Sequence, residues 1–258
     1  MRTLFFLLSL FVFQCCHAGI LESEVVFDNR LGSAVLFQPE KSQPVKGGVI
    51  VIHEWWGMNA HARERAARLA EAGYAAIAVD MYGHGKVAAH PQDAKAFMTA
   101  ALAEPDRMQA RFDAAHQVLQ SLAGVDASRV FAIGFCFGGS VVLEQARKGA
   151  ALAGVASFHG GLSTQNPAQK GQVKARVLVA TGGADPMIPP EQVGAFVTEM
   201  SAAAVDFELL SFPGVLHGFT NSGADALGEQ FGLPLAYNAE ADQRSWEALM
   251  RFLDLGSE

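Results

Sequence analysis

A cysteine lies between two glycines in the segment Gly134-Phe135-Cys136-Phe137-Gly138. An apolar run at 130–135 leads into this segment, and a run of small residues that suits a helix follows it. In a strand–turn–helix context this pattern is typical of a catalytic nucleophile on a tight turn, where larger flanking residues would clash. The partial positive charge at the start of the helix favours a thiolate and the oxyanion formed on acyl attack. The pattern predicts nucleophilic catalysis by Cys136; the alternative is a glycine-rich turn that carries a buried, inert cysteine.

A carboxylate and an imidazole follow in the order that such a nucleophile needs. Asp185 comes after an apolar run at 177–180, and His217 comes after another at 207–212. Ligands bind beyond the carboxyl ends of parallel strands, so we expect the three side chains at one edge of a sheet. The imidazole would take the thiol proton, and the carboxylate would fix its tautomer and stabilise its charged form. The order is that of the α/β-hydrolases; a turn-forming Asp185 and a loop histidine at 217 are the alternatives.

The elements that must position these side chains alternate along the chain. An opening hairpin is expected from strands at 24–27 and 34–37. Further strands are expected at 49–52, 75–79, 130–135, 154–158, 177–180 and 207–212, and helices at 60–72, 106–123, 139–148, 191–202 and 239–255. Short apolar strands between helices predict an α/β protein with the α/β-hydrolase fold, a mostly parallel central sheet with helices on both faces. Segments 83–104 and 219–238 are expected to be irregular and to border the pocket.

The first eighteen residues have the pattern of a secretory signal peptide. Arg2 precedes an apolar run at 4–13, and Ala18 is the small residue expected before a cleavage site. The apolar run is short for a span of a bilayer, although an uncleaved membrane anchor is the alternative. We therefore expect a signal peptide at 1–18, a single domain at 19–258, and an exported protein that is periplasmic or secreted.

Composition limits the partners and cofactors of the mature chain. Removal of the signal leaves Cys136 as the one cysteine, which excludes an intramolecular disulfide. Without Arg2 there are 18 basic and 26 acidic residues, and a net charge of −8 argues against nucleic acid or an anionic membrane as partner. His53-Glu54 lacks the second histidine of a zinc-protease motif, and no metal or other cofactor is expected. We expect no stable membrane insertion after processing, and a monomer or weak dimer.

Four segments resemble the dienelactone hydrolase (carboxymethylenebutenolidase) family, at 49–59, 78–83, 134–139 and 214–219. The resemblance implies the triad of Cys136, Asp185 and His217. It further implies that Glu54 approaches the resting thiol and helps to create the thiolate when substrate arrives. The backbone N–H groups of Trp55 and Phe137 would form the oxyanion hole, which agrees with the general need for one N–H after the nucleophile and one from the first strand-to-helix loop. A helix-capping role for Glu54 is the alternative.

Residues for substrate binding are expected on the loops around the triad. The candidates are Trp56, Tyr82, His84, Lys86, His159 and Phe219, and His53 also ends a strand near them. His61, His90 and His116 are expected on exposed helix faces. Family members that act on dienelactone hold its carboxylate with arginines shortly after Asp80 and a few residues beyond the catalytic histidine. This chain has His84 and Lys86 near the first position and Thr220-Asn221 at the second, and these residues do not bind carboxylate as arginine does.

Three functions fit these observations. The first is an exported cysteine hydrolase of a small ester or lactone, which forms a thioester on Cys136. The second is a thioesterase or acyltransferase on the same fold. The third is a non-catalytic member whose Trp55 and Trp56 bind a ligand.

Overall fold

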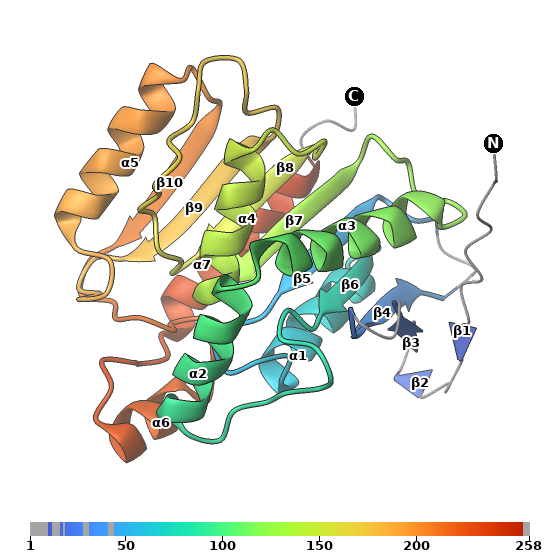
Figure 1. Ribbon diagram of the computed structural model, residues 1–258, viewed down its shortest axis with the longest axis horizontal. Helices are drawn as coiled ribbons and strands as arrows, with labels where there is room; N and C mark the ends of the chain where they lie inside the picture. Colours follow the sequence, from blue (N-terminus) through green and yellow to red (C-terminus); the bar gives the residue numbers. More distant parts are fainter. Residues whose placement is uncertain (1–9, 12–15, 18, 28–30, 41–43, 255–258) are drawn as a thin grey trace.

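The computed structural model describes residues 10–11, 16–17, 19–27, 31–40 and 44–254 (Figure 1). Its strands are β1 (Leu10–Phe11), β2 (Cys16–His17), β3 (Ile20–Val26), β4 (Ser33–Pro39), β5 (Gly48–Ile52), β6 (Ala75–Val79), β7 (Val130–Phe135), β8 (Gly154–Phe158), β9 (Arg176–Gly182) and β10 (Phe207–Phe212). Its helices are α1 (Ala60–Glu71), α2 (Pro91–Leu102), α3 (Pro105–Ser121), α4 (Phe137–Arg147), α5 (Pro190–Ala202), α6 (Ala224–Phe231) and α7 (Ala239–Asp254).

The described strands form one sheet in the order β1-β3-β4-β6-β5-β7-β8-β9-β10, with β2 also paired to β3. Pairing is parallel from β6 to β10, whereas β3 and β4 are antiparallel to their neighbours. The predicted α/β-hydrolase class, with its opening hairpin and mostly parallel sheet, is confirmed. The predicted signal peptide lies largely outside the described residues; of its span, β1 and β2 are seen as short antiparallel partners of β3.

Helices cover both faces of the sheet, as its apolar strands require. On one face, Ile50 and Ile52 of β5 pack in a core shared with α3, α4 and α5. On the other, Val49 and Val51 of the same strand pack with α1 and α7. Figure 1 shows α3 and α4 in front of the sheet. The alternation of side chains along β5 thus divides the core into two layers.

Two helices were not expected from the sequence. Segments 83–104 and 219–238 contain α2 and α6, so the prediction that they are irregular is wrong there. Their apolar residues pack in a third cluster around Trp56, which includes Ala94 of α2, Ala224 of α6 and the partly buried Phe231. Figure 1 shows both helices at the same end of the molecule. Helix α2 also contacts the main core, in which its Ala101 is buried.

No helix in the described part of the chain has the length and apolar character needed to cross a membrane.

Candidate active site

Cys136 lies on a strained turn between β7 and α4. Its backbone has φ 51° and ψ −114°, a left-handed conformation that is rare for a residue with a side chain. A Cβ atom at Gly134 would lie 2.1 Å from the carbonyl oxygen of Gly138, and one at Gly138 would lie 2.3 Å from that of Ile52. Both glycines are therefore required by close backbone approach. The turn leaves Cys136 half-buried, with its thiol at the start of α4.

His217 and Asp185 meet at the ends of β10 and β9. Nδ1 of His217 lies 2.7 Å from Oδ2 of Asp185, and both side chains are buried. The other carboxylate oxygen of Asp185 accepts a hydrogen bond from the backbone N–H of Met187 at 2.8 Å. A Cβ atom at Gly182 would lie 2.4 Å from the carbonyl oxygen of Val215, so this glycine lets the histidine loop close against β9. The carboxylate is thus fixed to hold one tautomer of the imidazole.

The electrostatic environment of His217 suits a proton acceptor. Burial opposes its charged form, but the charge of Cys136 and then the hydrogen bond to Asp185 act in the other direction and raise its pKa to about 10. Its second ring nitrogen, Nε2, is buried and makes no hydrogen bond of ordinary geometry within the described residues. This nitrogen is available for the proton of the Cys136 thiol, so the three residues can hold a thiolate beside an imidazolium.

Two backbone N–H groups are available near the nucleophile. Phe137 is the first residue of α4, so its N–H precedes the intrahelical hydrogen bonds. Neither this group nor the N–H of Trp55 appears as a donor in the turn, loop and cap hydrogen bonds of the described chain. The N–H of Gly138 donates to the carbonyl oxygen of His53 at 3.1 Å and thereby ties the start of α4 to the loop that carries Trp55. The N–H groups of Trp55 and Phe137 suit an oxyanion hole.

The sequence profile described as "Dienelactone hydrolase family" matches residues 33–255, which is most of the chain. The chain belongs to the dienelactone hydrolase family. It is a carboxylic ester hydrolase.

Similar proteins agree with this membership. A solved dienelactone hydrolase-like promiscuous phosphotriesterase from metagenomic libraries is 32% identical, with a TM-score of 0.82 over 92% of this chain and 98% of that one. A putative carboxymethylenebutenolidase from Saccharolobus solfataricus is 23% identical over 90% of this chain and 98% of its own. A probable 2-oxo-3-(5-oxofuran-2-ylidene)propanoate lactonase from Bradyrhizobium sp. is 26% identical over 80% of this chain and 82% of its own.

Glu54 of this dienelactone hydrolase family member is buried, and its carboxylate is hydrogen-bonded to a residue after β10. Its Oε2 atom accepts a hydrogen bond of 2.7 Å from Nδ2 of Asn221, and no hydrogen bond joins it to Cys136 in the described structure. The expectation that Glu54 approaches the resting thiol therefore stays a prediction. Burial is the main cause that raises the pKa of Glu54 to about 6, while Asn221, His217 and Arg65 partly offset it.

A buried polar network lies behind the triad. Arg65 of α1 binds Asp242 of α7 through two hydrogen bonds of 2.8 and 3.0 Å, and it also donates to the carbonyl oxygen of Thr220. The hydroxyl of Thr220 lies 3.3 Å from Nε2 of His61 and 2.9 Å from Nε2 of His159. His61 is buried, so the expectation of an exposed position is wrong. The spacing of His61 and Arg65 by four residues, about one helical turn, is the sequence signal that would have indicated a shared inner face.

The six predicted substrate contacts divide into four groups. Tyr82 lies near the nucleophile: its hydroxyl donates to the carbonyl oxygen of Trp55 at 2.9 Å, and its ring lies 5.6 Å from that of Phe137. Trp56 is buried in the cluster between α2 and α6.

His84 and Lys86 are exposed on the loop before α2, and Nζ of Lys86 lies 5.5 Å from the ring centre of Phe97. His159 and Phe219 have no exposed surface and pack against each other, and His159 also packs against the His217 ring. Because neither side chain has exposed surface, both are better described as packing behind His217 than as contacts for a substrate. The same holds for His53, which is fully buried and accepts from the N–H of Met81 at 3.1 Å.

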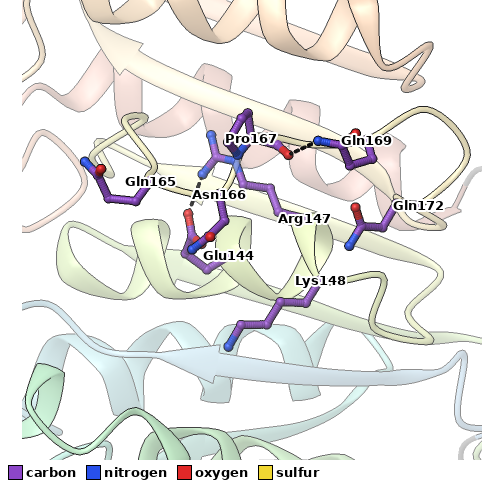
Figure 2. A pocket seen from close by; sticks show the side chains of 8 residues that line it. All are labelled: Glu144, Arg147, Lys148, Gln165, Asn166, Pro167, Gln169 and Gln172. Atoms are coloured by element: carbon purple, nitrogen blue, oxygen red, sulfur yellow. Dashed lines mark hydrogen bonds and ion pairs between the residues drawn. The ribbon is translucent and has the colours of Figure 1, made fainter.

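A surface cavity of about 360 Å³ lies at the C-terminal end of α4, away from the triad. Figure 2 shows the side chains that line it, which are Glu144, Arg147, Lys148, Gln165, Asn166, Pro167, Gln169 and Gln172. The guanidinium of Arg147 is paired there with Glu144 at 2.8 Å and with Glu199, also at 2.8 Å. The cavity thus contains no nucleophile and no unpaired arginine. Within the described residues, no group of three or more histidine, cysteine or acidic side chains is placed to hold a metal ion.

Proposed function

We propose that the protein is a cysteine-dependent hydrolase of small carboxylic esters or lactones, with Cys136 as nucleophile, His217 as base and acid, and Asp185 as the carboxylate that orients it. The observation that supports this most directly is the buried pair of His217 and Asp185, 2.7 Å apart, with Nε2 of the imidazole left free beside the strained cysteine turn. An inert cysteine would need neither the strain nor the pair.

The reaction divides into two acyl transfers. The thiol proton passes to Nε2 of His217, and the sulfur of Cys136 attacks the carbonyl carbon of the ester. The N–H groups of Trp55 and Phe137 donate to the oxyanion. The C–O bond to the alcohol then breaks, and His217 returns the proton to the leaving oxygen, which leaves a thioester on Cys136. Water, deprotonated by His217, attacks the thioester and releases the acid and the thiol. In a lactone, acid and alcohol are parts of one product.

We assign uncharged substrates to this site because its charges do not favour a carboxylate. Asn221 is neutral, and its amide is engaged by the Glu54 carboxylate. Arg65 is buried and already bound to Asp242. The side chains of His84 and Lys86 are exposed and lie outside the buried site. At an effective dielectric constant of about 20, two like charges about 8 Å apart repel by about 2 kcal/mol, so Glu54 disfavours an anionic acyl group by roughly thirtyfold.

The test is a pair of aryl esters with one leaving group, of which one carries an uncharged acyl chain and the other a chain of equal length that ends in a carboxylate. The uncharged ester should have the higher kcat/KM by about tenfold or more, and Cys136→Ala should abolish its cleavage while the circular dichroism spectrum stays the same. Dienelactone, which is anionic, serves as a third substrate. Full activity of Cys136→Ala would contradict the mechanism, and a preference for the anionic ester would contradict only the substrate class.

We also propose that the protein is exported, on the basis of the charged start, apolar run and small residue before the expected cleavage site in residues 1–18. N-terminal sequencing of protein recovered from outside the cytoplasm of an expressing cell should begin at Gly19. Recovery of protein that still carries residues 1–18 would contradict cleavage there.

A further inference from the structure

His159 is a buried histidine with a strained backbone at the end of β8. Its φ of 40° lies in the left-handed region, which a residue with a side chain adopts only where its surroundings impose it. Its N–H donates to the carbonyl oxygen of Ala180 in β9 at 2.8 Å, and the carbonyl oxygen of Phe158 before it accepts from the N–H of Cys136 at 2.9 Å. These hydrogen bonds place His159 between the turn that carries Cys136 and the strand that leads to Asp185.

The ring of His159 packs against the ring of the proposed catalytic base. The ring centres of His159 and His217 lie 5.0 Å apart in an edge-to-face arrangement, and Phe219 packs edge-to-face on His159 at 5.1 Å. In the described structure, the His217 ring is held by a hydrogen bond of 2.7 Å from Nδ1 to Asp185, and Nε2 makes none of ordinary geometry. One hydrogen bond does not by itself prevent rotation of the ring about that bond. The contact with His159 therefore limits the direction in which Nε2 of His217 points.

A hydroxyl group anchors the ring of His159. Oγ1 of Thr220 lies 2.9 Å from Nε2 of His159, whereas Nδ1 of His159 has no hydrogen-bond partner among the described residues. Thr220 is buried, and its carbonyl oxygen accepts a hydrogen bond from Arg65, which is itself paired with Asp242. The same hydroxyl lies 3.3 Å from Nε2 of His61. Thr220 is thus fixed through its backbone, and its hydroxyl sets the orientation of the His159 ring.

The His159 ring stays uncharged beside His217. Burial lowers the pKa of His159 well below its ordinary range, and the charges of His217, His61 and Arg65 act in the same direction. A neutral ring packs against the imidazolium of His217 without the repulsion that a second positive charge would bring. The contact can therefore hold His217 both before and after it takes up a proton.

We propose that His159 is a positioning residue for the reaction: anchored by Thr220, its ring holds the His217 imidazole so that Nε2 keeps one direction while the proton passes to and from it. The inference rests on the proposed function, because it concerns the proposed base. His159 acts through His217, since it has no exposed surface to offer a substrate. Because His217 serves in both the formation and the hydrolysis of the thioester, loss of this support slows both steps together, which lowers kcat and changes KM little.

The informative variants alter the anchor and leave the triad in place. Thr220→Val keeps the shape of the side chain but lacks the hydroxyl, and Thr220→Ser keeps the hydroxyl. His159→Phe keeps an aromatic ring against His217 but cannot bind Thr220. Thr181→Val is the matched control, because the hydroxyl of Thr181 is also buried and has no hydrogen-bond partner among the described residues.

The measurements are kcat and KM for an uncharged aryl ester, with urea unfolding to record stability separately. Thr220→Val should lower kcat about fivefold, the factor that corresponds to one neutral hydrogen bond, with little change in KM. Thr220→Ser should keep most of the wild-type kcat, and Thr181→Val should keep all of it. His159→Phe should lower kcat by a similar factor, and in that background Thr220→Val should cost less than about twofold more. This coupling separates the effect of the hydroxyl on His159 from its contact with His61, and a role in stability alone would not produce it.

Three outcomes would overturn the inference: an unchanged kcat in Thr220→Val, a loss in Thr220→Ser or Thr181→Val equal to that in Thr220→Val, or an equal cost of Thr220→Val in the wild-type and His159→Phe backgrounds. If His159→Phe fails to fold, the comparison of Thr220→Val, Thr220→Ser and Thr181→Val still decides it. These results are distinct from failure of the proposed function, which would appear as ester cleavage by Cys136→Ala.

Discussion

The hydroxyl of Tyr82 donates a hydrogen bond of 2.9 Å to the carbonyl oxygen of Trp55, and so links the loop after β6 to the loop after β5. The position of Tyr82 is itself fixed by Asp80, whose Oδ1 atom accepts from the N–H groups of Tyr82 at 3.0 Å and Gly83 at 2.8 Å. The N–H of Trp55 is one of the two proposed oxyanion donors. Asp80 and Tyr82 therefore support the proposed oxyanion hole from the loop after the neighbouring strand β6.

Removal of the hydrogen bond from Tyr82 to Trp55 should affect turnover more than substrate binding. We expect Tyr82→Phe to lower kcat about fivefold with little change in KM, because one neutral hydrogen bond contributes about 1 kcal/mol and here it positions an oxyanion donor. Steady-state kinetics with an uncharged aryl ester provide the measurement. Tyr74→Phe is the matched control, since its hydroxyl donates to Asp254 at 2.7 Å and should affect stability alone. An equal loss of kcat in both variants would contradict the role of Tyr82 in positioning the Trp55 donor.

Gly138, two residues after Cys136, should tolerate no side chain. In Gly138→Ala the new Cβ atom would lie 2.3 Å from the carbonyl oxygen of Ile52, so the start of α4 must move away from β5. The two oxyanion donors then separate, and we expect kcat to fall about a hundredfold. Gly194→Ala in α5 is the control, because no heavy atom outside its own helix backbone lies within 4 Å of the added carbon. That variant should be active and about 0.5–1 kcal/mol more stable.

Removal of one partner of the buried ion pair between Arg65 and Asp242 should lower the stability of the fold strongly. Arg65→Met leaves the Asp242 carboxylate buried without its cation, so the free energy of unfolding should fall by about 3–5 kcal/mol. The double variant Arg65→Met/Asp242→Leu removes both charges and should recover much of that loss. Urea unfolding of the single and double variants shows whether the loss of stability comes from the unpaired charge or from the removed side chain. Equal stability of the two variants would show that the charge left behind carries no penalty.

The stability conferred by Glu54 should depend on pH in a defined direction. Its pKa is raised from 4.5 to about 6 in the folded protein, so folding favours the protonated form. The wild type is expected to lose about 2 kcal/mol of stability as pH rises through this window, because the unfolded chain ionises first. Glu54→Gln keeps an acceptor for Asn221 but carries no ionisable group at this position, so its stability does not fall over the same pH range. The stability of the variant relative to the wild type should therefore rise by about 2 kcal/mol between about pH 4 and pH 7 in urea unfolding; a constant difference would contradict the buried, ionisable carboxylate.

The sequence predicted the arrangement of the strands and the place of Cys136, Asp185 and His217 after them because both follow from a regular pattern. Cys136, Asp185 and His217 each come just after an apolar strand, and parallel strands bring those ends to one edge. The neighbouring sequence was enough for this prediction, because the position of each residue depends only on the strand that directly precedes it.

The partner of Glu54 and the burial of His61 were not predictable in this way. Asn221 holds Glu54 across 167 positions of sequence, and Arg65 meets Asp242 across 177, so the contacts depend on how two loops and two helices pack. The helices α2 and α6 were missed for a similar reason, because Ala94 of α2 and Ala224 of α6 pack in a separate cluster with Trp56, a residue distant in sequence from both.

The most direct measurement is mass spectrometry of the protein after rapid acid quenching during turnover of an uncharged aryl ester. We expect an added acyl group that maps to the peptide containing Cys136, is released by hydroxylamine, and is absent from Cys136→Ala. Rapid hydrolysis by the wild type with no acyl group on Cys136, together with an active Cys136→Ala variant, would contradict it.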